Sequence, residues 1–223
     1  MRPRAARRRI LSGGIIFCIK VSKRALDVTF SLIGTAVSSP ILLAVAAAVK
    51  LDSKGPVIFK QERLGKDGKV FEMYKFRSMC VGAEHMGTGQ YSYKGDSRVT
   101  RVGKIIRATS LDELPQFINI LKGDMSFIGP RPTLTYHPWK LEEYTDFQRR
   151  RFEVRPGITG LAQVHGRKAI DWNDRIKYDV EYVDNLSLGL DCKILFQTVW
   201  NVLTMKDNDN VGKTSQTKEN KDA

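Results

Sequence analysis

VTFSLIGTAVSSPILLAVAAAV, residues Val28–Val49, holds no charged side chain over its 22 residues. A straight helix of this length would be roughly 33 Å long, enough to cross a hydrocarbon core of about 30 Å. A cleavable signal peptide fits less well, since the apolar run is long and begins late in the chain. The stretch therefore predicts a membrane helix near the amino terminus.

Two features of this helix favour entry and exit on the same side of the membrane. Lys and Arg are frequent on both flanks, and basic flanks stay in the cytoplasm. Ser38-Ser39-Pro40 lies near the middle, where proline removes a backbone donor and the serines can hydrogen-bond the freed carbonyls. We therefore predict a re-entrant helix that breaks at Ser39 and Pro40. An ordinary spanning helix with a proline kink is the alternative.

The charge of the chain is concentrated around this apolar stretch. Residues 1–80 carry a net charge of +11 out of a total of +13. Such a distribution suits an anionic lipid surface, at about 1 kcal/mol for each well-placed Lys or Arg. Nucleic acid is the rival partner of a basic chain, but a nucleic-acid-binding protein rarely contains such an uncharged run, and we expect no nucleic acid.

The cysteines and histidines give no metal pattern. Three cysteines, Cys18, Cys80 and Cys192, are far apart and odd in number, and the three histidines form no HxxxH pair. We expect reduced thiols in a cytoplasmic compartment and no zinc site.

The remaining sequence predicts a mixed α/β fold that is mostly helical. Strands are expected at Pro56–Phe59 and Lys69–Tyr74 around a turn at Lys66–Gly68, and helices at Ser110–Leu121, 138–152, Asp171–Val183 and Leu188–Met205. The last of these helices is amphipathic, which fits either a membrane surface or a core-facing helix.

We expect one compact domain with a re-entrant membrane helix and amphipathic surface helices. The expected divisions are a basic amino-terminal extension (1–22), a helix-break-helix in the membrane (23–50), a catalytic domain on the cytoplasmic face (51–205) and a disordered tail (206–223).

Ser110-Leu-Asp112-Glu113-Leu-Pro115 is the most informative polar stretch. Ser110 and Glu113 match a capping box, which places both carboxylates in a first helical turn where the ionised form is favoured. An ionised Asp112 could attack phosphorus, and adjacent carboxylates could hold Mg²⁺ against a diphosphate. Acidic residues that merely start a helix are the simpler alternative.

Several arginines surround this stretch in the sequence. Arg107 precedes Asp112, Arg131 is fixed between two prolines, and Arg155 and Arg167 flank Pro156–Gly160. Guanidinium groups bind phosphate oxygens in a bidentate manner, although each arginine could equally be a solvated surface charge. No GxxxxGK[ST] or GxGxxG motif is present, so a P-loop is excluded.

Taken in order, these residues resemble the monotopic phosphoglycosyl transferases, also called bacterial sugar transferases, from about Lys23 to Leu203. The blocks that carry the resemblance are Lys23-Arg24-x-x-Asp27, Ser39-Pro40, Pro56–Phe59, Gln61–Arg63, Lys75–Met79, Leu111–Gln116, Lys122–Ser126, Gly129–Pro132 and Arg155–Gly160. Each block alone is weak evidence, whereas all of them in this order are specific. Leu161 and His165 stand where the family often has Trp and Asn.

The resemblance implies a role for each matching residue. Asp112 would be the nucleophile that also contacts Mg²⁺, and Glu113 its dyad partner. Three arginines would bind the phosphates of the nucleotide sugar, namely Arg107, Arg131 and Arg167. The anchor and helix break would be Lys23, Arg24, Asp27, Ser39 and Pro40, with the apolar helix re-entrant.

The activity implied is transfer of a sugar 1-phosphate from a UDP-sugar to polyprenyl (undecaprenyl) phosphate through an aspartyl intermediate. This reaction would be the first membrane step of polysaccharide or glycoprotein glycan assembly, on the cytoplasmic face of the bacterial inner membrane. Two alternatives stay open, a Mg²⁺-dependent lipid diphosphate phosphohydrolase and a non-catalytic, membrane-tethered basic binding module. The sugar, the pathway and the formation of a homo-oligomer are also open.

Overall fold

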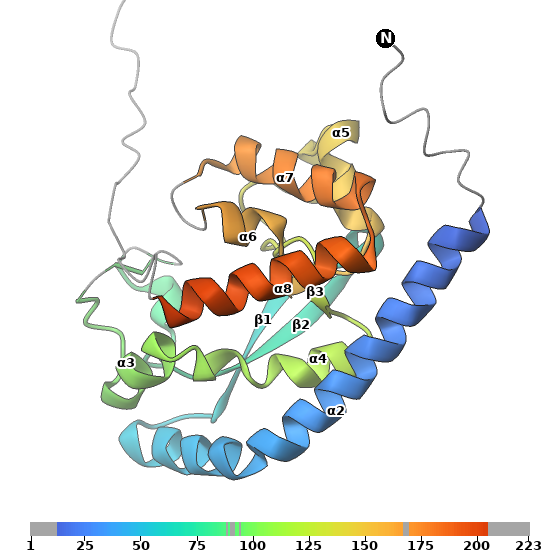
Figure 1. Cartoon of the computed structure of the whole chain (residues 1–223). Helices are drawn as coiled ribbons and strands as arrows, with labels where there is room; N and C mark the ends of the chain where they lie inside the picture. The colour runs from blue at the N-terminus through green and yellow to red at the C-terminus, as the bar shows by residue number, and fades with distance from the viewer. Residues whose placement is uncertain (1–12, 88, 90–91, 94, 167–169, 205–223) are drawn as a thin grey trace, which may run out of the picture.

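The long amino-terminal helix dominates the architecture. The computed structural model describes residues 13–87, 89, 92–93, 95–166 and 170–204. Helix α2 covers Gly13–Asp52, so residues 13–22 of the expected extension continue the membrane helix. The rest of that extension and the expected tail lie outside the described residues. Figure 1 shows α2 running down one side of the molecule and then turning beneath it.

Short elements follow α2 along the chain. They are β1 (Ile58–Leu64), η1 (Lys66–Gly68), β2 (Val70–Phe76), η2 (Ala83–His85), α3 (Arg101–Ala108), η3 (Leu111–Glu113), α4 (Gln116–Lys122), β3 (Ser126–Ile128), η4 (Leu141–Glu143), α5 (Asp146–Arg149), η5 (Arg150–Glu153), β4 (Gly157–Thr159), α6 (Leu161–Gly166), α7 (Trp172–Asp184) and α8 (Leu188–Leu203), where η marks a 3-10 helix. The fold is mixed α/β and mostly helical, as the sequence predicts.

The proline in α2 is accommodated by the serines before it. Pro40 has no N–H to offer the carbonyl four residues earlier, which belongs to Ala36. The Ser39 hydroxyl donates to that carbonyl at 2.8 Å, and the Ser38 hydroxyl donates to Gly34 O at 2.6 Å. The predicted bonding of carbonyls by the serines is therefore confirmed. The predicted break in the helix is not seen, because α2 continues through Pro40 as one element.

The apolar side chains of α2 point mostly outward. Val37 is 75% exposed and Leu43 is 72% exposed, while Val45 and Val49 pack inward against a cluster around Phe76. The part Ile16–Asp52 is long and apolar enough to cross a membrane. Exposed apolar surface of this extent is costly in water and marks contact with a lipid or a partner.

Three side chains of the Lys23-Arg24-x-x-Asp27 motif attach α2 to three different elements. The Lys23 ammonium lies 2.7 Å from the Asp191 carboxylate in α8. The Arg24 guanidinium donates at 2.6 and 2.9 Å to two carbonyls in the last turn of α4. The buried Asp27 carboxylate accepts from a hydroxyl and a backbone N–H at the start of β3, at 3.0 and 3.1 Å. The motif is thus a clamp between the apolar helix and the rest of the chain.

The other end of α2 is held by Arg77, which follows β2. Its buried guanidinium donates to Val49 O at 3.1 Å and to Ser53 O at 2.7 Å. These carbonyls lie at the helix C-terminus, where a cation also complements the helix dipole. Between the two ends, α4 comes so close that a Cβ at Gly34 would lie 2.9 Å from the Phe117 ring.

Two small sheets position the remaining helices. Strands β1 and β2 pair antiparallel from Ile58 opposite Phe76 to Leu64 opposite Val70, with η1 as the turn, so the predicted hairpin is confirmed. Strands β3 and β4 pair in parallel, with Ser126 opposite Gly157. The parallel pair brings two distant motif blocks together.

The helix predictions are confirmed for α7 and α8 and are wrong for residues 138–152. That region forms η4, α5 and η5 instead of one helix. Thr145 breaks the run by capping α5, where it forms a capping box with Gln148. Tyr144 is buried against Phe152 and α7, so packing also favours the break.

Candidate active site

The acidic pair Asp112–Glu113 occupies η3, the single turn between α3 and α4. The predicted capping box at this turn is wrong. Ser110 adopts a left-handed conformation, with a φ of 58°, and its side chain caps nothing. The Glu113 carboxylate points elsewhere because a stronger, charged donor is available to it.

That donor is Lys75 in β2. Its Nζ lies 2.7 Å from Glu113 Oε1, and Arg131 Nη2 lies 3.7 Å from the same oxygen. Both partners of the shorter contact are largely shielded from solvent, at 18% and 24% side-chain exposure. Glu113 is therefore held between an ammonium and a guanidinium group.

Asp112 differs from its neighbour. Among the described residues, no cation lies within 4 Å of its carboxylate, although the side chain is half-buried. Burial is the largest influence on the pKa of Asp112 and raises it, while Lys75 and Arg107 oppose the rise and Glu113 adds to it. A partly desolvated carboxylate in the field of cations is suited to nucleophilic attack on phosphorus.

The structure brings two of the three expected phosphate-binding arginines to this turn. Arg107, in the last turn of α3, acts electrostatically on Asp112, and Arg131 reaches Glu113. Arg167 lies outside the described residues. Arg155 has a structural role, because its Nε donates to Gly123 O at 2.7 Å at the end of α4.

Arg131 is positioned by a backbone crossing between two motif blocks. The Gly129 N–H donates to Thr159 O at 2.9 Å, and a Cβ at Gly129 would lie 2.3 Å from Arg155 O. A Cβ at Gly157 would lie 2.2 Å from Gly129 N. Any side chain at either glycine would push the strands β3 and β4 apart, so the Gly-Pro-Arg-Pro turn depends on both.

Arg151 and Asp179 form a second support of this turn. Their side chains, each 1% exposed, lie 2.7 Å apart between Arg151 Nη2 and Asp179 Oδ2. The same Nη2 donates to Arg131 O at 2.8 Å. Sequence reasoning missed Arg151, Asp179 and Lys75, because their partners lie far away along the chain.

The donor set allows Mg²⁺ but does not form a complete metal cage. The described residues hold no group of three or more His, Cys, Asp or Glu side chains that could bind a metal. Magnesium usually takes one or two carboxylates and fills its other positions with water and substrate phosphates. Asp112, which is not engaged by a cation, fits such a site. The three cysteines, Cys18, Cys80 and Cys192, form no disulfide in the structure.

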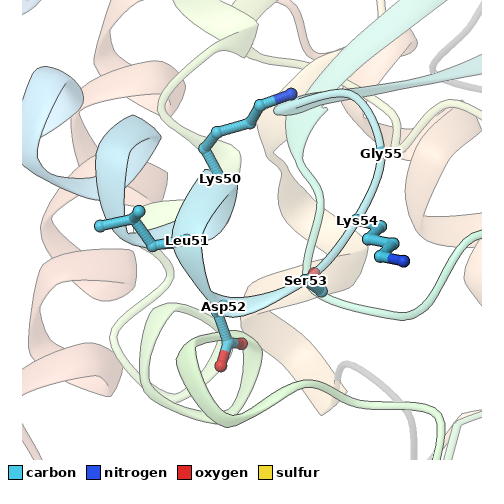
Figure 2. A pocket seen from close by; sticks show the side chains of 6 residues that line it. All are labelled: Lys50, Leu51, Asp52, Ser53, Lys54 and Gly55. Atoms are coloured by element: carbon cyan, nitrogen blue, oxygen red, sulfur yellow. The ribbon is translucent and has the colours of Figure 1, made fainter.

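A surface hollow of about 420 Å³ at the end of α2 does not coincide with this site. Lys50–Gly55 line it, and none of the expected site residues does so. The side chains of Lys50, Asp52 and Lys54 point in different directions rather than toward one centre (Figure 2). Asp52 instead accepts the Val102 N–H of α3 at 3.0 Å, which is a structural contact.

Comparison with known proteins decides the family. The sequence profile described as "Bacterial sugar transferase" matches residues 18–205, which includes the dyad, both described arginines and the α2 clamp. The chain belongs to the bacterial sugar transferase family. The predicted resemblance is thus confirmed, and the chain is a member of a family of transferases, that is, of enzymes.

Several bacterial sugar transferases are identical to this chain at nearly half of the aligned positions. The UDP-N-acetylgalactosamine-undecaprenyl-phosphate N-acetylgalactosaminephosphotransferase of Aeromonas hydrophila is 47% identical over 185 residues, 82% of this chain and 44% of the relative. The UDP-glucose:undecaprenyl-phosphate glucose-1-phosphate transferase of Klebsiella pneumoniae is 48% identical over 185 residues, 81% of this chain and 40% of the relative. The uncharacterized sugar transferase EpsL of Bacillus subtilis is 46% identical over 183 residues, which are 82% of this chain and 88% of the relative. This chain therefore spans less than half the length of the first and second of these relatives.

Proposed function

We propose that this chain transfers a sugar 1-phosphate from a UDP-sugar to polyprenyl phosphate, with Asp112 as the nucleophile. The observation that carries the proposal is the difference in ion pairing between the two carboxylates of the dyad. Glu113 is held by Lys75 at 2.7 Å, whereas the neighbouring Asp112 carboxylate has no cation within 4 Å among the described residues. The names of the relatives, which act on UDP-sugars and undecaprenyl phosphate, supply the substrate classes.

The reaction has two displacement steps. In the first, an Asp112 oxygen attacks the phosphorus that bears the sugar, the bond from that phosphorus to the bridging oxygen breaks, and UMP leaves. In the second, an oxygen of polyprenyl phosphate attacks the same phosphorus and releases the Asp112 carboxylate. The product is a polyprenyl diphosphate sugar, and the enzyme returns to its starting state.

The neighbouring charges act on the phosphates. Arg131 lies 3.7 Å from Glu113, Arg107 acts electrostatically on Asp112, and both arginines attract the diphosphate of the donor. Lys75 fixes Glu113, which orients the turn that carries Asp112. Bound Mg²⁺ would offset the negative charge that builds up on the leaving UMP.

The membrane geometry follows from the two substrates, because one is soluble in water and the other stays in the bilayer. We propose that α2 is re-entrant, with its bend at Ser39-Pro40 in the lipid and both ends on the cytoplasmic face. Helix α8 would lie at the same surface, since it exposes Phe196, Trp200 and Leu203 at 72%, 54% and 74%. The alternative of a core-facing α8 would leave these three side chains unexplained.

A UMP-release assay tests the proposal. The full chain in lipid nanodiscs is supplied with a panel of UDP-sugars and Mg²⁺, with and without undecaprenyl phosphate. The expected result is that at least one UDP-sugar gives UMP over many turnovers only when the polyprenyl phosphate is present, together with an equal amount of glycolipid. Without the lipid, no more than about one UMP per enzyme molecule should appear, from formation of the aspartyl intermediate. Release at the same rate without the lipid would identify a hydrolase, and no release with any donor would contradict the proposal.

A further inference from the structure

One side chain of α4 covers the free edge of β2. Strands β1 and β2 form a two-stranded sheet, so one edge of β2 has no neighbouring strand. At this edge the Tyr74 N–H donates to Asn119 Oδ1 at 2.9 Å, and Asn119 Nδ2 donates to Glu72 O at 2.7 Å. The amide therefore takes the place of the backbone groups that another strand would supply.

The Asn119 side chain is held in one orientation. It is 0% exposed, and its Nδ2 also donates to Asp124 Oδ2, at 3.3 Å. A primary amide has two N–H donors and one acceptor oxygen, and here both donors and the oxygen have partners. Turning the amide over would place its oxygen against Glu72 O and a carboxylate, and would leave the Tyr74 N–H unpaired. The pairing of Asn119 with β2 is thus specific as well as buried.

This pairing fixes which residues of β2 face α4. Side chains alternate along a strand, so Met73 and Lys75 point to the same side of β2. Met73 packs in a buried cluster with α4, and Lys75 Nζ lies 2.7 Å from Glu113 Oε1. The two backbone groups that Asn119 binds lie on either side of Met73. A slip of one residue between β2 and α4 would turn Lys75 to the other side of the strand.

The acidic pair and Asn119 belong to one short stretch of chain. Glu113 ends η3 and α4 begins at Gln116, so Asn119 follows Glu113 by six residues. The start of this stretch meets the Lys75 ammonium, and the middle of α4 meets the β2 backbone. A lysine has a long flexible side chain, so the place of its ammonium depends on where the backbone is held. Asn119 holds that backbone at Tyr74, next to Lys75.

We infer that Asn119 is a positioning residue of the active site, which acts through Lys75. It holds β2 in register with α4, and this register places the Lys75 ammonium against Glu113. The inference rests on the proposed function, to which it adds a neutral residue between two motif blocks, Leu111–Gln116 and Lys122–Ser126, that the pattern of charges does not single out.

Competitive labelling of lysines tests the register without requiring turnover. The full chain in nanodiscs is treated with a trace of an amine-reactive acetyl ester, and mass spectrometry gives the labelling rate of each lysine. In Asn119→Ala, Lys75 should lose its fixed contact and be labelled about threefold faster or more than in the wild type. Lys23 is the internal control, because it is similarly shielded and paired, at 15% side-chain exposure and 2.7 Å from Asp191. The labelling rate of Lys23 should not change.

Two further variants separate the register from stability. Ile120→Val removes a methylene from a 0% exposed neighbour of Asn119, so it loosens the packing of α4 but keeps the hydrogen bonds to β2. It should label Lys75 at the wild-type rate. Asn119→Ser keeps one hydroxyl for the strand edge, so Lys75 should be labelled at an intermediate rate. It replaces Asn119→Ala if that variant does not fold.

A double-mutant cycle shows whether Asn119 acts through Lys75. Asn119→Ala alone should lower kcat for transfer several-fold with a smaller change in KM, and by less than Lys75→Met does. In the Lys75→Met background the same change should alter kcat less than about twofold, because the contact that Asn119 positions is already lost. A merely structural role would give the same several-fold loss in both backgrounds.

The outcomes separate this inference from the proposed function. Unchanged labelling of Lys75 in both Asn119 variants, equal acceleration at Lys75 and Lys23, or equal kinetic losses in both backgrounds would overturn the positioning role, even if the wild-type chain transfers sugar phosphate. Faster labelling of Lys75 alone, combined with no transfer by the wild-type chain to any lipid acceptor, would support the positioning of Lys75 and contradict the proposed function.

Discussion

Lys75 Nζ and Glu113 Oε1 lie 2.7 Å apart, across the space between the β-hairpin and the turn of the acidic pair. This contact divides two adjacent carboxylates into one that is neutralised and one that is not. Under the proposed mechanism, Glu113 orients the turn, while the Asp112 oxygens attack phosphorus and contact the metal. The predictions below follow from this division and from the supports around it.

Replacing Asp112 by Asn should abolish transfer. The amide is nearly the same size but is a poor nucleophile, so turnover should fall to less than about a hundredth, a loss of at least ~2.7 kcal/mol in barrier terms. UMP release and the mass spectrum of the trapped protein measure the effect, and the wild type alone should carry a sugar-phosphate adduct. A variant that keeps more than about a tenth of the activity, a cost of only ~1.4 kcal/mol, would exclude the covalent role.

Replacing Lys75 by Met should lower kcat about tenfold with a smaller change in KM, because Glu113 loses its partner and the turn loses its orientation. Steady-state kinetics with a UDP-sugar measures both constants. Lys122→Met is the matched control, as Lys122 is an exposed lysine that also contacts a β2 side chain, Tyr74, at 3.1 Å. Equal kinetics for the two variants would mean that the Lys75–Glu113 contact is only structural.

Removal of divalent metal should stop the reaction. The proposed transition state carries added charge on the diphosphate, and Asp112 alone cannot compensate for it. Excess chelator should abolish UMP release, and Mg²⁺ should restore it, while the circular dichroism of the chain stays the same. Full activity in the chelator would reject a metal in this mechanism.

The topology of α2 can be measured with single cysteines. In a variant without Cys18, Cys80 and Cys192, one cysteine replaces Arg9 or Lys54, and intact cells are treated with a membrane-impermeant thiol reagent. A re-entrant helix keeps both sites cytoplasmic, so both should react only after the membrane is opened. Labelling of one site alone in intact cells would show that the helix spans.

The same cysteine-labelling assay tests the proposed bend of α2 at Ser39-Pro40. Replacing Ser39 and Pro40 together by Ala restores the backbone donor and removes the proline clash, which should straighten α2. The basic flanks oppose crossing, so a mixed population is expected rather than a complete switch. An unchanged labelling pattern would show that these two residues do not set the topology.

The buried pair Arg151–Asp179 should give the chain an unusual pH dependence. Desolvation outweighs the attraction of Arg151 and raises the pKa of Asp179 from 3.8 to about 6. A raised carboxyl pKa favours the fold in the neutral form, so this contribution is full below 3.8 and is lost as the pH rises through about 6. Relative to Asp179→Asn, the wild type should gain up to ~1.4 kcal/mol of unfolding free energy for each pH unit between 6 and 4.

Denaturant unfolding of both proteins in detergent at several pH values provides the measurement. The two stability curves should diverge toward acid. If they stay parallel across this range, Asp179 remains ionised and the ion pair is better compensated than its burial indicates.

Local sequence patterns were sufficient for some of the elements and for the acidic pair, but not for residues 138–152. The apolar run, the Lys66–Gly68 turn and the amphipathic stretches of α7 and α8 each depend on neighbours within a few residues. Asp112 and Glu113 were recognisable as adjacent carboxylates at the expected start of a helix, with arginines nearby in the sequence. The capping box failed for a tertiary reason, since the Glu113 carboxylate pairs with Lys75, 38 residues away.

The supports of the site could not be predicted because they join residues far apart in the chain. Lys23 and Asp191 are separated by 168 positions, and nothing local to either residue indicates the other. The same holds for Gly129 and Gly157. In the sequence each glycine indicates only a turn, whereas the structure shows that the two backbones cross in close contact. Close approach between distant segments is a property of packing, which a single sequence does not encode in any short window.

Helix α2 is fixed to the folded chain near both of its ends, by the clamp that includes Lys23 and by Arg77. With α2 in the bilayer as proposed, the reacting groups would stay at a constant height, and the proposed lipid acceptor would reach them only by diffusion in the plane of the membrane. The frequency of encounters then depends on the amount of polyprenyl phosphate per unit area of membrane. The reaction rate should therefore follow the mole fraction of polyprenyl phosphate among the lipids. Adding inert lipid at a fixed amount of substrate would slow such an enzyme by dilution within the surface, although no concentration in the surrounding water has changed.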